Sequence, residues 1–250
     1  MEHNHPSLWQ SDIPKPVPGG HKYGRGSALI YGAPELTGAT RLAAESCARI
    51  GSGLVTVVGG AKADVYRCTL PAHILVRDQA PADMSKITAV LLGCGGLPNP
   101  SPSCVNGHFA VIRDAEAIGD NIPANAYDAR TILTPHEGEF MRAFPTLTGT
   151  KEEKAVAAAR LSGAVIVYKG AQTVIAHPDG RAVQNIVEAP YLATAGTGDV
   201  LAGMITGLCA QGMAPFLAAC AAVYIHGEMG RAAGPGLVAS DLPSLIPRYL

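Results

Sequence analysis

Short runs of apolar residues, each followed by a polar or glycine-containing turn, recur along most of this chain. Such runs are typical of strands buried on both faces, as in a parallel sheet. Residues 37–50 carry apolar side chains at helical spacing and separate the first two runs, which makes a strand–helix–strand unit. The alternation predicts an α/β fold with a mostly parallel sheet. The predicted strands are residues 27–31, 54–58, 87–92, 109–112, 131–133, 164–168, 173–176 and 182–186, the last two joined as a hairpin.

The helical segments carry their own end signals. Thr37 is a suitable N-cap for the first helix, and a helix over residues 151–161 has acidic residues in its first turn, where the helix dipole favours them. Residues 200–225 contain no charged residue, a length that could span a membrane. However, the Gln-Gly-Met-Ala-Pro sequence at 211–215 indicates that one helix stops and another begins. We therefore expect two buried helices and no membrane span.

Composition limits the class of protein. The 29 glycines and 19 prolines make about a fifth of the 250 residues, which is below the level of low-complexity chains. One large domain is therefore expected over residues 21–250. Residues 1–20, which are rich in proline, are expected to be a lead-in or linker remnant. The formal net charge is −1 without runs of like charge, which predicts small-molecule partners and neither a nucleic-acid nor a membrane surface. The polar start lacks the apolar stretch of a signal peptide, and the cysteines lack a zinc-binding spacing, so we expect a cytoplasmic protein with reduced thiols. The cysteines are Cys47, Cys68, Cys94, Cys104, Cys209 and Cys220.

The most informative motif is L-A-T-A-G-T-G-D at residues 192–199. Small residues precede a predicted helix, so the backbone N–H groups of Gly196, Thr197 and Gly198 can point at one anion, which the helix dipole also favours. A phosphate repels a neighbouring carboxylate. Asp199 therefore makes chemical sense as a base that takes a proton from a hydroxyl attacking phosphorus. The alternative is a glycine-rich turn in which Asp199 caps the helix.

Four further segments could hold a ligand. Lys169 ends a strand and precedes a glycine and a threonine hydroxyl, so its point charge could meet nucleotide phosphates. His136 follows another strand, at the carboxyl edge where open α/β sheets bind ligands. Residues 21–26 (H-K-Y-G-R-G) could close over a phosphate or form a simple turn, and residues 93–96 (G-C-G-G) are either a ligand loop or only a turn. No P-loop motif occurs, so any nucleotide is held differently.

Taken together, these segments resemble a known family. The chain carries, in order, H-K-Y-G-R-G, T-G-A-T-R-L-A-A with G-S-G-L-V-T-V, G-C-G-G, L-T-P-H-E-G-E, K-G-A-Q-T-V-I, L-A-T-A-G-T-G-D-V-L-A-G and L-V-A-S-D-L. The ordered set, which covers residues 21–242, is similar to that of the ADP- or ATP-dependent NAD(P)H-hydrate dehydratases, which are related to carbohydrate kinases. The resemblance implies a ribokinase-like three-layer sandwich, with helices on both faces of the sheet, and a dehydratase domain at residues 21–250.

The resemblance also implies a reaction. NADH or NADPH that has added water to its nicotinamide ring is repaired by phosphorylation of the ring hydroxyl from ADP or ATP, with Mg2+ expected, and phosphate is then eliminated. Asp199 would be the catalytic base, and Gly196, Thr197 and Gly198 the anion hole. No residue is assigned as a metal ligand. The residues matching the family's adenine-nucleotide site are Lys169, Gly170, Ala171, Gln172, Thr173 and Gly198, and those matching contacts to the hydrated dinucleotide are Ala39, Gly95, His136 and Asp199.

The chain departs from the family's pattern in several loops. Cys94 replaces the proline of G-P-G-L-G, Glu137 replaces the second proline of T-P-H-P-G-E, and Glu188 begins an E-A-P stretch where Gly-Asn-Pro is usual. Residues 114–118 read D-A-E-A-I in place of D-A-D-A-L. Two alternatives therefore stay open: a small-molecule kinase of the same fold acting on a vitamin-precursor alcohol or sugar, and a nucleotide-binding homologue that has lost turnover. The family commonly forms tetramers and many members carry an NAD(P)H-hydrate epimerase domain, so a homo-oligomer and a separate epimerase partner are expected.

Overall fold

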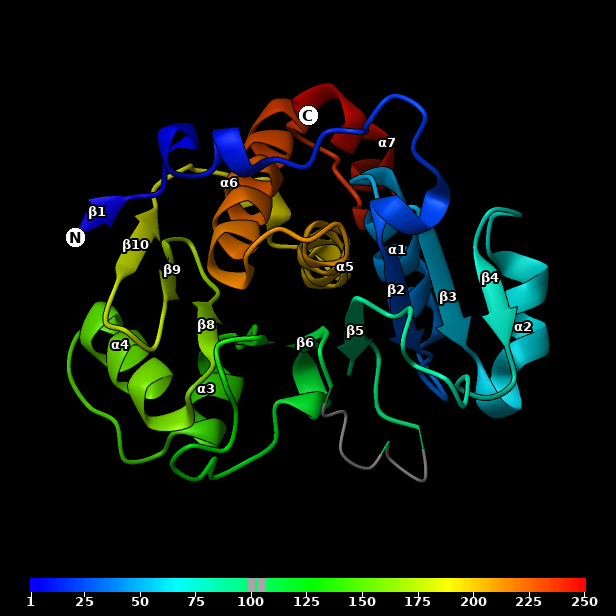
Figure 1. Ribbon diagram of the computed structural model, residues 1–250. Coiled ribbons are helices and arrows are strands. Elements are labelled where there is room, and N and C mark those ends of the chain that lie inside the picture. Colours follow the sequence, from blue (N-terminus) through cyan, green and yellow to red (C-terminus); the bar gives the residue numbers. More distant parts are fainter. Residues whose placement is uncertain (99–101, 103–106) are drawn as a thin grey trace.

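The computed structural model describes residues 1–98, 102 and 107–250, and a ten-stranded sheet runs through the molecule (Figure 1). The strands are β1 (Glu2–His3), β2 (Ser27–Tyr31), β3 (Leu54–Val58), β4 (Leu75–Arg77), β5 (Ala89–Leu92), β6 (Ala110–Arg113), β7 (Thr131–Leu133), β8 (Val165–Tyr168), β9 (Thr173–Ala176) and β10 (Ala182–Asn185). Their order across the sheet is β1-β10-β9-β8-β7-β6-β5-β2-β3-β4. Among the described strands, β9 runs antiparallel to both neighbours and the other pairings are parallel.

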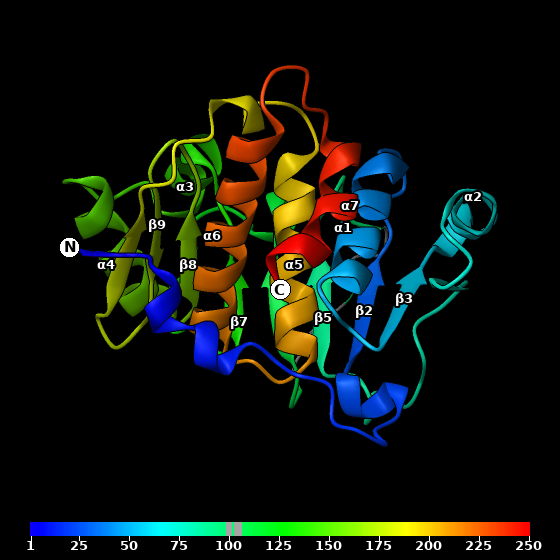
Figure 2. The same cartoon turned by 90° about the horizontal axis from the view of Figure 1, so that it is seen from above.

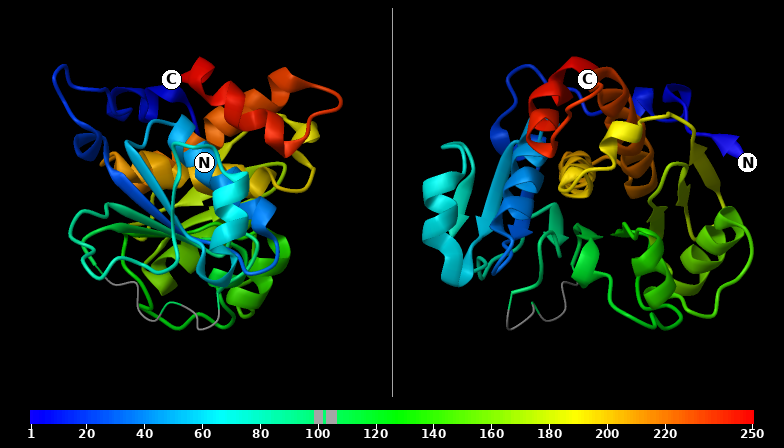
Figure 3. Two further views of the ribbon diagram at one scale, coloured as in Figure 1. Left: turned by 90° about the vertical axis from the view of Figure 1, so that its right-hand side faces the viewer. Right: turned by 180° about the vertical axis from the view of Figure 1, so that it is seen from behind.

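Helices cover both faces of the sheet, which confirms the three layers that were expected. The helices are α1 (Thr37–Arg49), α2 (Ala63–Thr69), α3 (Glu137–Ala143), α4 (Lys151–Ser162), α5 (Thr197–Ala210), α6 (Pro215–Ala233) and α7 (Leu242–Leu245). One face carries α1, α5, α6 and α7, whereas α3 and α4 pack below β7 to β9 on the other (Figures 1 and 3). The short helix α2 packs beside the edge strand β4.

The helices α1 and α5 approach each other so closely that their backbones touch. A Cβ atom on Gly203 of α5 would lie 2.2 Å from the carbonyl oxygen of Ala43 in α1. One turn later, a Cβ on Gly207 would lie 2.6 Å from the carbonyl oxygen of Cys47. At these two positions glycine therefore allows the backbone of α5 to lie directly against α1.

The strand and helix predictions hold in most of their detail. The eight predicted strands are present, with ends within two residues of those expected, and α5 and α6 break at residues 211–214 as predicted. No helix in the described ranges is long and apolar enough to cross a membrane. The predicted N-cap was wrong: Thr37 is the first residue of α1, and the N-cap is Leu36, which makes no capping hydrogen bond through its side chain. Cys104 lies outside the described residues, and the five cysteines within them are unpaired.

Residues 1–20 lie against the domain. β1 pairs with β10 at the edge of the sheet, and the chain then crosses the face that carries α6 before it reaches β2 (Figure 2). Trp9 is 4% exposed, and its ring packs 5.6 Å from that of Tyr224. The division of the chain at residue 20 stays a prediction, but these first residues contribute a strand and a core side chain to the fold.

The strand order places the ligand-binding edge. β2 has β3 on one side and β5 on the other, so the chain direction across the sheet reverses between β2 and β5. In open α/β sheets, such a reversal opens a crevice outside the carboxyl ends of the strands. Cys94, Asp114 and Lys169 each follow the end of a strand at this edge.

Candidate active site

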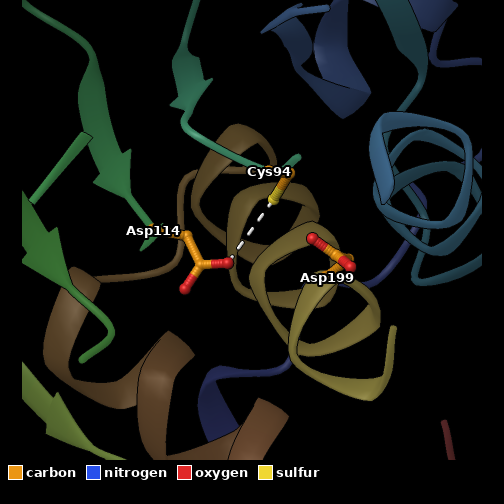
Figure 4. Close-up of side chains that lie close together, drawn as sticks. All are labelled: Cys94, Asp114 and Asp199. Carbon is orange, nitrogen blue, oxygen red and sulfur yellow. Dashed lines mark hydrogen bonds between the residues drawn. The ribbon is translucent and has the colours of Figure 1, made fainter. Parts of the chain in front are cut away.

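A thiol and two carboxylates meet at the carboxyl edge of the sheet. Cys94 follows β5, Asp114 follows β6, and Asp199 lies in the first turn of α5 (Figure 4). Their ligand atoms lie within 4.8 Å of one another, and the thiol of Cys94 donates to Oδ2 of Asp114 at 3.7 Å. Cys94 and Asp114 are buried, while Asp199 is partly buried. Two acidic groups are thus brought close together where little water reaches them.

This environment changes the proton affinity of Asp199. Burial raises the pKa of its carboxyl group, the negative charge of Asp114 raises it further, and the neighbouring Cys94 thiol and the Lys169 charge act in the opposite direction. The result is a pKa of about 6 in place of 3.8. At neutral pH the carboxylate is ionised, yet it is far more basic than an ordinary aspartate. Asp199 can therefore accept a proton from a substrate hydroxyl.

Lys169 supplies the positive charge of the site. Its Nζ donates to Oδ1 of Asp114 at 2.8 Å and lies 4.0 Å from Oε2 of Glu139. Burial lowers the pKa of the Lys169 ammonium, but the Asp114 and Glu139 carboxylates outweigh that effect and raise it. The ammonium group also lies beside the start of α5, because a Cβ on Gly198 would be 3.4 Å from Nζ. Lys169 thus stands charged between Asp114 and the predicted anion hole.

The predicted anion hole opens the helix α5. Gly196 is the N-cap residue, with a φ of 92°, and no side chain caps the first turn. The hydroxyl of Thr197 donates to the carbonyl oxygens of Leu192 and Thr194 at 2.8 and 3.1 Å, which holds the loop in place. Since Gly196 occupies the cap, Asp199 does not act as the capping residue. The first N–H groups of α5 have the arrangement that binds an anion.

A cavity of about 540 Å³ adjoins the start of α5. Of the six residues matched to the nucleotide site, Gln172 does not line it, and its side chain instead accepts a hydrogen bond from Gln184 at 2.9 Å. The other five, Lys169, Gly170, Ala171, Thr173 and Gly198, line the cavity. The apolar residues Val187, Leu192, Leu201 and Val223 also line it, as does Glu188, one of the departures from the family's pattern. The lining thus combines charged and apolar side chains.

Two residues matched to the dinucleotide site also lie together. A Cβ on Gly95 would stand 2.8 Å from Cβ of Ala39, so the loop after β5 touches the start of α1. Thr40 fixes this contact, because its hydroxyl accepts from the N–H of Ala33 and donates to the carbonyl of Cys94 at 3.2 Å. The loop at 93–96 is therefore held against α1 beside the cluster of acidic groups.

His136 has a clear structural role as the N-cap of α3. Its Nδ1 accepts from the N–H of Glu139, and Oε2 of Glu139 accepts from the N–H of His136 at 2.8 Å, which makes a capping box. The side chain stays 58% exposed, so it can also meet a ligand. Glu137, the departure in this loop, accepts from the Tyr168 hydroxyl at 2.6 Å and from Lys154 at 3.3 Å. Glu137 thus ties the start of α3 to the end of β8.

Residues 21–26 do not reach the site. They precede β2 and so lie at the amino edge of the sheet, where the side chain of Arg25 donates to the carbonyl of Gly51 at 2.8 Å. Of the two interpretations, phosphate closure was therefore wrong and the turn is correct. Neither Asp114 nor Glu139 was predicted to belong to the site. The signal for Asp114 was its position directly after a buried strand at the carboxyl edge.

Comparison with known proteins supports the resemblance. The family described as NAD(P)H-hydrate dehydratase matches residues 27–249. The chain is 34% identical to the bifunctional NAD(P)H-hydrate repair enzyme Nnr of Moorella thermoacetica, over 96% of this chain and 52% of that one. It is 30% identical to the ADP-dependent (S)-NAD(P)H-hydrate dehydratase of Xanthomonas campestris, over 95% and 92% of the two chains. The chain thus spans about half the length of the bifunctional relatives, but nearly all of this dehydratase.

Solved structures agree. The ADP/ATP-dependent NAD(P)H-hydrate dehydratase of Bacillus subtilis, co-crystallised with ATP and Mg2+, superimposes with a TM-score of 0.84 at 30% identity, over 100% of this chain and 97% of that one. Ribokinase from Thermotoga maritima, at 14% identity and a TM-score of 0.59, shares the fold alone. Sequence, fold and the order of the motifs along the strands lead to one conclusion: the chain belongs to the NAD(P)H-hydrate dehydratase family.

Proposed function

We propose that this protein dehydrates hydrated NADH or NADPH, with ADP or ATP as the phosphoryl donor, and so restores the reduced dinucleotide. The observation that carries the proposal is Asp199, a base with a pKa of about 6 in the first turn of a helix whose N-terminus can bind the transferred phosphoryl group. The activities for which the relatives in Xanthomonas and Bacillus are named support the same reaction.

The site residues suggest a sequence of steps. The nucleotide occupies the 540 Å³ cavity, and its terminal phosphoryl group lies against the N–H groups of residues 196–198. Asp199 takes the proton of the ring hydroxyl, whose oxygen forms a bond to phosphorus as the bond to the nucleotide breaks. The lone pair of the ring nitrogen then expels phosphate, and a proton leaves the neighbouring carbon to restore the double bond. Lys169 balances the negative charge throughout.

The residues present fit a magnesium ion carried with the nucleotide. The two carboxylates of Asp114 and Asp199 lie beside the anion hole and raise the local negative charge. Magnesium prefers oxygen ligands and often keeps several waters, with one or two carboxylates and the phosphates of the substrate completing its shell. The thiol of Cys94 is a soft ligand and does not suit it. When bound, magnesium would neutralise phosphate charge, while Asp199 still acts as the base.

The experiment is to mix the protein with hydrated NADH, magnesium and either ADP or ATP. Recovery of the dihydronicotinamide absorbance, with release of free phosphate, is the expected result. A kinase of the same fold would instead release a stable phosphorylated product, and a homologue without turnover would bind nucleotide and release no phosphate. Absence of recovery with both nucleotides would contradict the proposal.

The wider setting is also proposed. Because two of the matched relatives are named as bifunctional NAD(P)H-hydrate repair enzymes, we propose that an NAD(P)H-hydrate epimerase activity works alongside this one. The formal net charge of −1 is compatible with self-association into a tetramer. Five unpaired cysteines among the described residues are compatible with the cytoplasm.

A further inference from the structure

A buried chain of hydrogen bonds leads from the N-terminal segment to the nucleotide cavity. The indole Nε1 of Trp9 donates to Oδ1 of Asn4 at 3.2 Å. Nδ2 of Asn4 donates to the carbonyl of Cys220 in α6 at 2.8 Å and to Oδ1 of Asn185 at 3.1 Å. Asn4 and Asn185 are 3% and 5% exposed. The pairing of β1 with β10 brings them together, since His3 is in register with Gln184 and the N–H of Asn4 donates to the carbonyl of Gln184.

The indole N–H of Trp9 and the carbonyl of Cys220 fix the orientation of the amide groups of Asn4 and Asn185. The indole N–H can only donate, so the oxygen of Asn4 must face Trp9. The carbonyl of Cys220 can only accept, so the nitrogen of Asn4 must face α6, and the same nitrogen meets Asn185. Asn185 must therefore turn its oxygen toward Asn4. The network leaves its nitrogen pointing away from Asn4, as a hydrogen-bond donor.

That donor lies at the cavity. Asn185 lines the 540 Å³ space together with Gly227 of α6, and a Cβ on Gly227 would stand 3.3 Å from Nδ2 of Asn185. Within the described part of the chain, Nδ2 of Asn185 makes no hydrogen bond, whereas its oxygen has the partner given above. Lys169 and the apolar residues Val187 and Val223 line the same cavity. A buried amide with one bonded end and one open end is suited to hold a ligand.

We propose that Nδ2 of Asn185 donates a hydrogen bond to the nucleoside part of the bound nucleotide, and that Asn4 and Trp9 position it. The inference rests on the proposed function in that it takes this cavity to be the nucleotide site. The group recognised is a hydrogen-bond acceptor, either a ring nitrogen of the purine or one of the two ribose hydroxyls. The N-terminal segment would then support nucleotide binding by positioning Asn185, without touching the nucleotide.

Calorimetric titration of the whole protein with ADP and its analogues tests this, because it needs no turnover. The analogues are 1-, 3- and 7-deaza-ADP, which each lack one ring nitrogen, and 2′- and 3′-deoxy-ADP, which each lack one ribose oxygen. The wild type should bind one analogue about three- to tenfold more weakly than ADP, as the loss of one hydrogen bond predicts. A deaza analogue identifies the purine and a deoxy analogue identifies the ribose. Equal binding of all five would overturn the proposal.

The variants separate recognition from stability. Asn185→Ala should bind ADP and the analogue that the wild type binds more weakly with equal affinity. Asn185→Asp keeps an oxygen for Asn4 but presents an acceptor to the nucleotide, so it should bind ADP still more weakly. Asn4→Ala should lose the discrimination as well. His3→Ala, at the exposed residue directly before Asn4, should keep it. If both Asn185 variants still distinguish ADP from that analogue, the contact is overturned. If Asn4→Ala still distinguishes them and only its melting temperature falls, Asn4 stabilises the fold and does not position Asn185.

The contact made by Asn185 and the proposed dehydration reaction can be tested independently. A protein that restores NADH but shows no discrimination among the analogues would overturn only the inference. Conversely, a protein that discriminates through Asn185 yet never restores NADH would support the inference and contradict the proposed reaction.

Discussion

Replacing the proposed base should make the protein more stable and inactive at once. In the folded chain the pKa of Asp199 is raised from 3.8 to about 6, chiefly by burial and then by the charge of Asp114. A carboxyl group whose pKa is raised by folding holds its proton more tightly in the folded state. Ionising it therefore costs stability as the pH rises through the interval between the two pKa values, and that cost persists above about 6. Asp199→Asn removes the cost and also removes the proton acceptor.

The magnitude follows from the two pKa values. Linkage predicts that Asp199→Asn gains about 1 kcal/mol in free energy of unfolding at pH 4.5 and about 3 kcal/mol at pH 7.5. Urea denaturation of both proteins at the two pH values measures this, and ionisable groups that do not interact with Asp199 cancel in the difference. The rate of NADH recovery should fall by at least about 100-fold, the usual contribution of a positioned base. A stability difference that is the same at both pH values would refute the reasoning about burial, and full activity in the variant would refute the role of the base.

Three further predictions follow from the same structure. The kcat/KM for hydrated NADH should fall below pH about 6, where Asp199 becomes protonated. Cys94→Ala should move that midpoint upward because the neighbouring thiol lowers the pKa of Asp199, and an unmoved midpoint in a pH–rate profile would contradict this. Lys169→Met should weaken ADP binding, which calorimetry can measure. It should also reduce the free energy of unfolding by about 3–5 kcal/mol in urea denaturation, because the buried Asp114 loses its cation. Gly203→Ala should lower the free energy of unfolding by about 1–3 kcal/mol or more, and an unchanged melting temperature would show that α1 and α5 can separate at little cost.

The elements that the sequence predicted well are those with a strong local pattern. The strands β2, β3, β7 and β9 were predicted at their observed limits, because buried strands are short runs of apolar residues bounded by turns. The helices α2 and α3 have seven residues each, too few for periodicity to indicate a helix. The two residues of β1 carry no strand pattern of their own. That strand exists because β10 offers an open edge to it.

The candidate site could be predicted only in part for a similar reason. Lys169 and Asp199 stood out because a lysine at the end of a strand and a carboxylate beside a glycine-rich turn need a local explanation. The pairing of Lys169 with Asp114 could not be read from either position, because it depends on β8 and β6 lying two places apart in the sheet. The contact between Asn4 and Asn185 joins residues 181 positions apart, and neither segment alone marks it.

The distance along the chain between the parts of this network has a consequence for how the protein is made. Asn4 donates to the carbonyl of Cys220, 216 residues further on, and β1 pairs with β10, so neither has its partner until most of the chain has left the ribosome. At about 5–20 residues per second, that delay is on the order of 10 to 40 seconds. During this time Trp9 is synthesised but has no core to enter. The N-terminal segment therefore docks late in biosynthesis, and the wall of the cavity that Asn185 helps to form is completed only at that step.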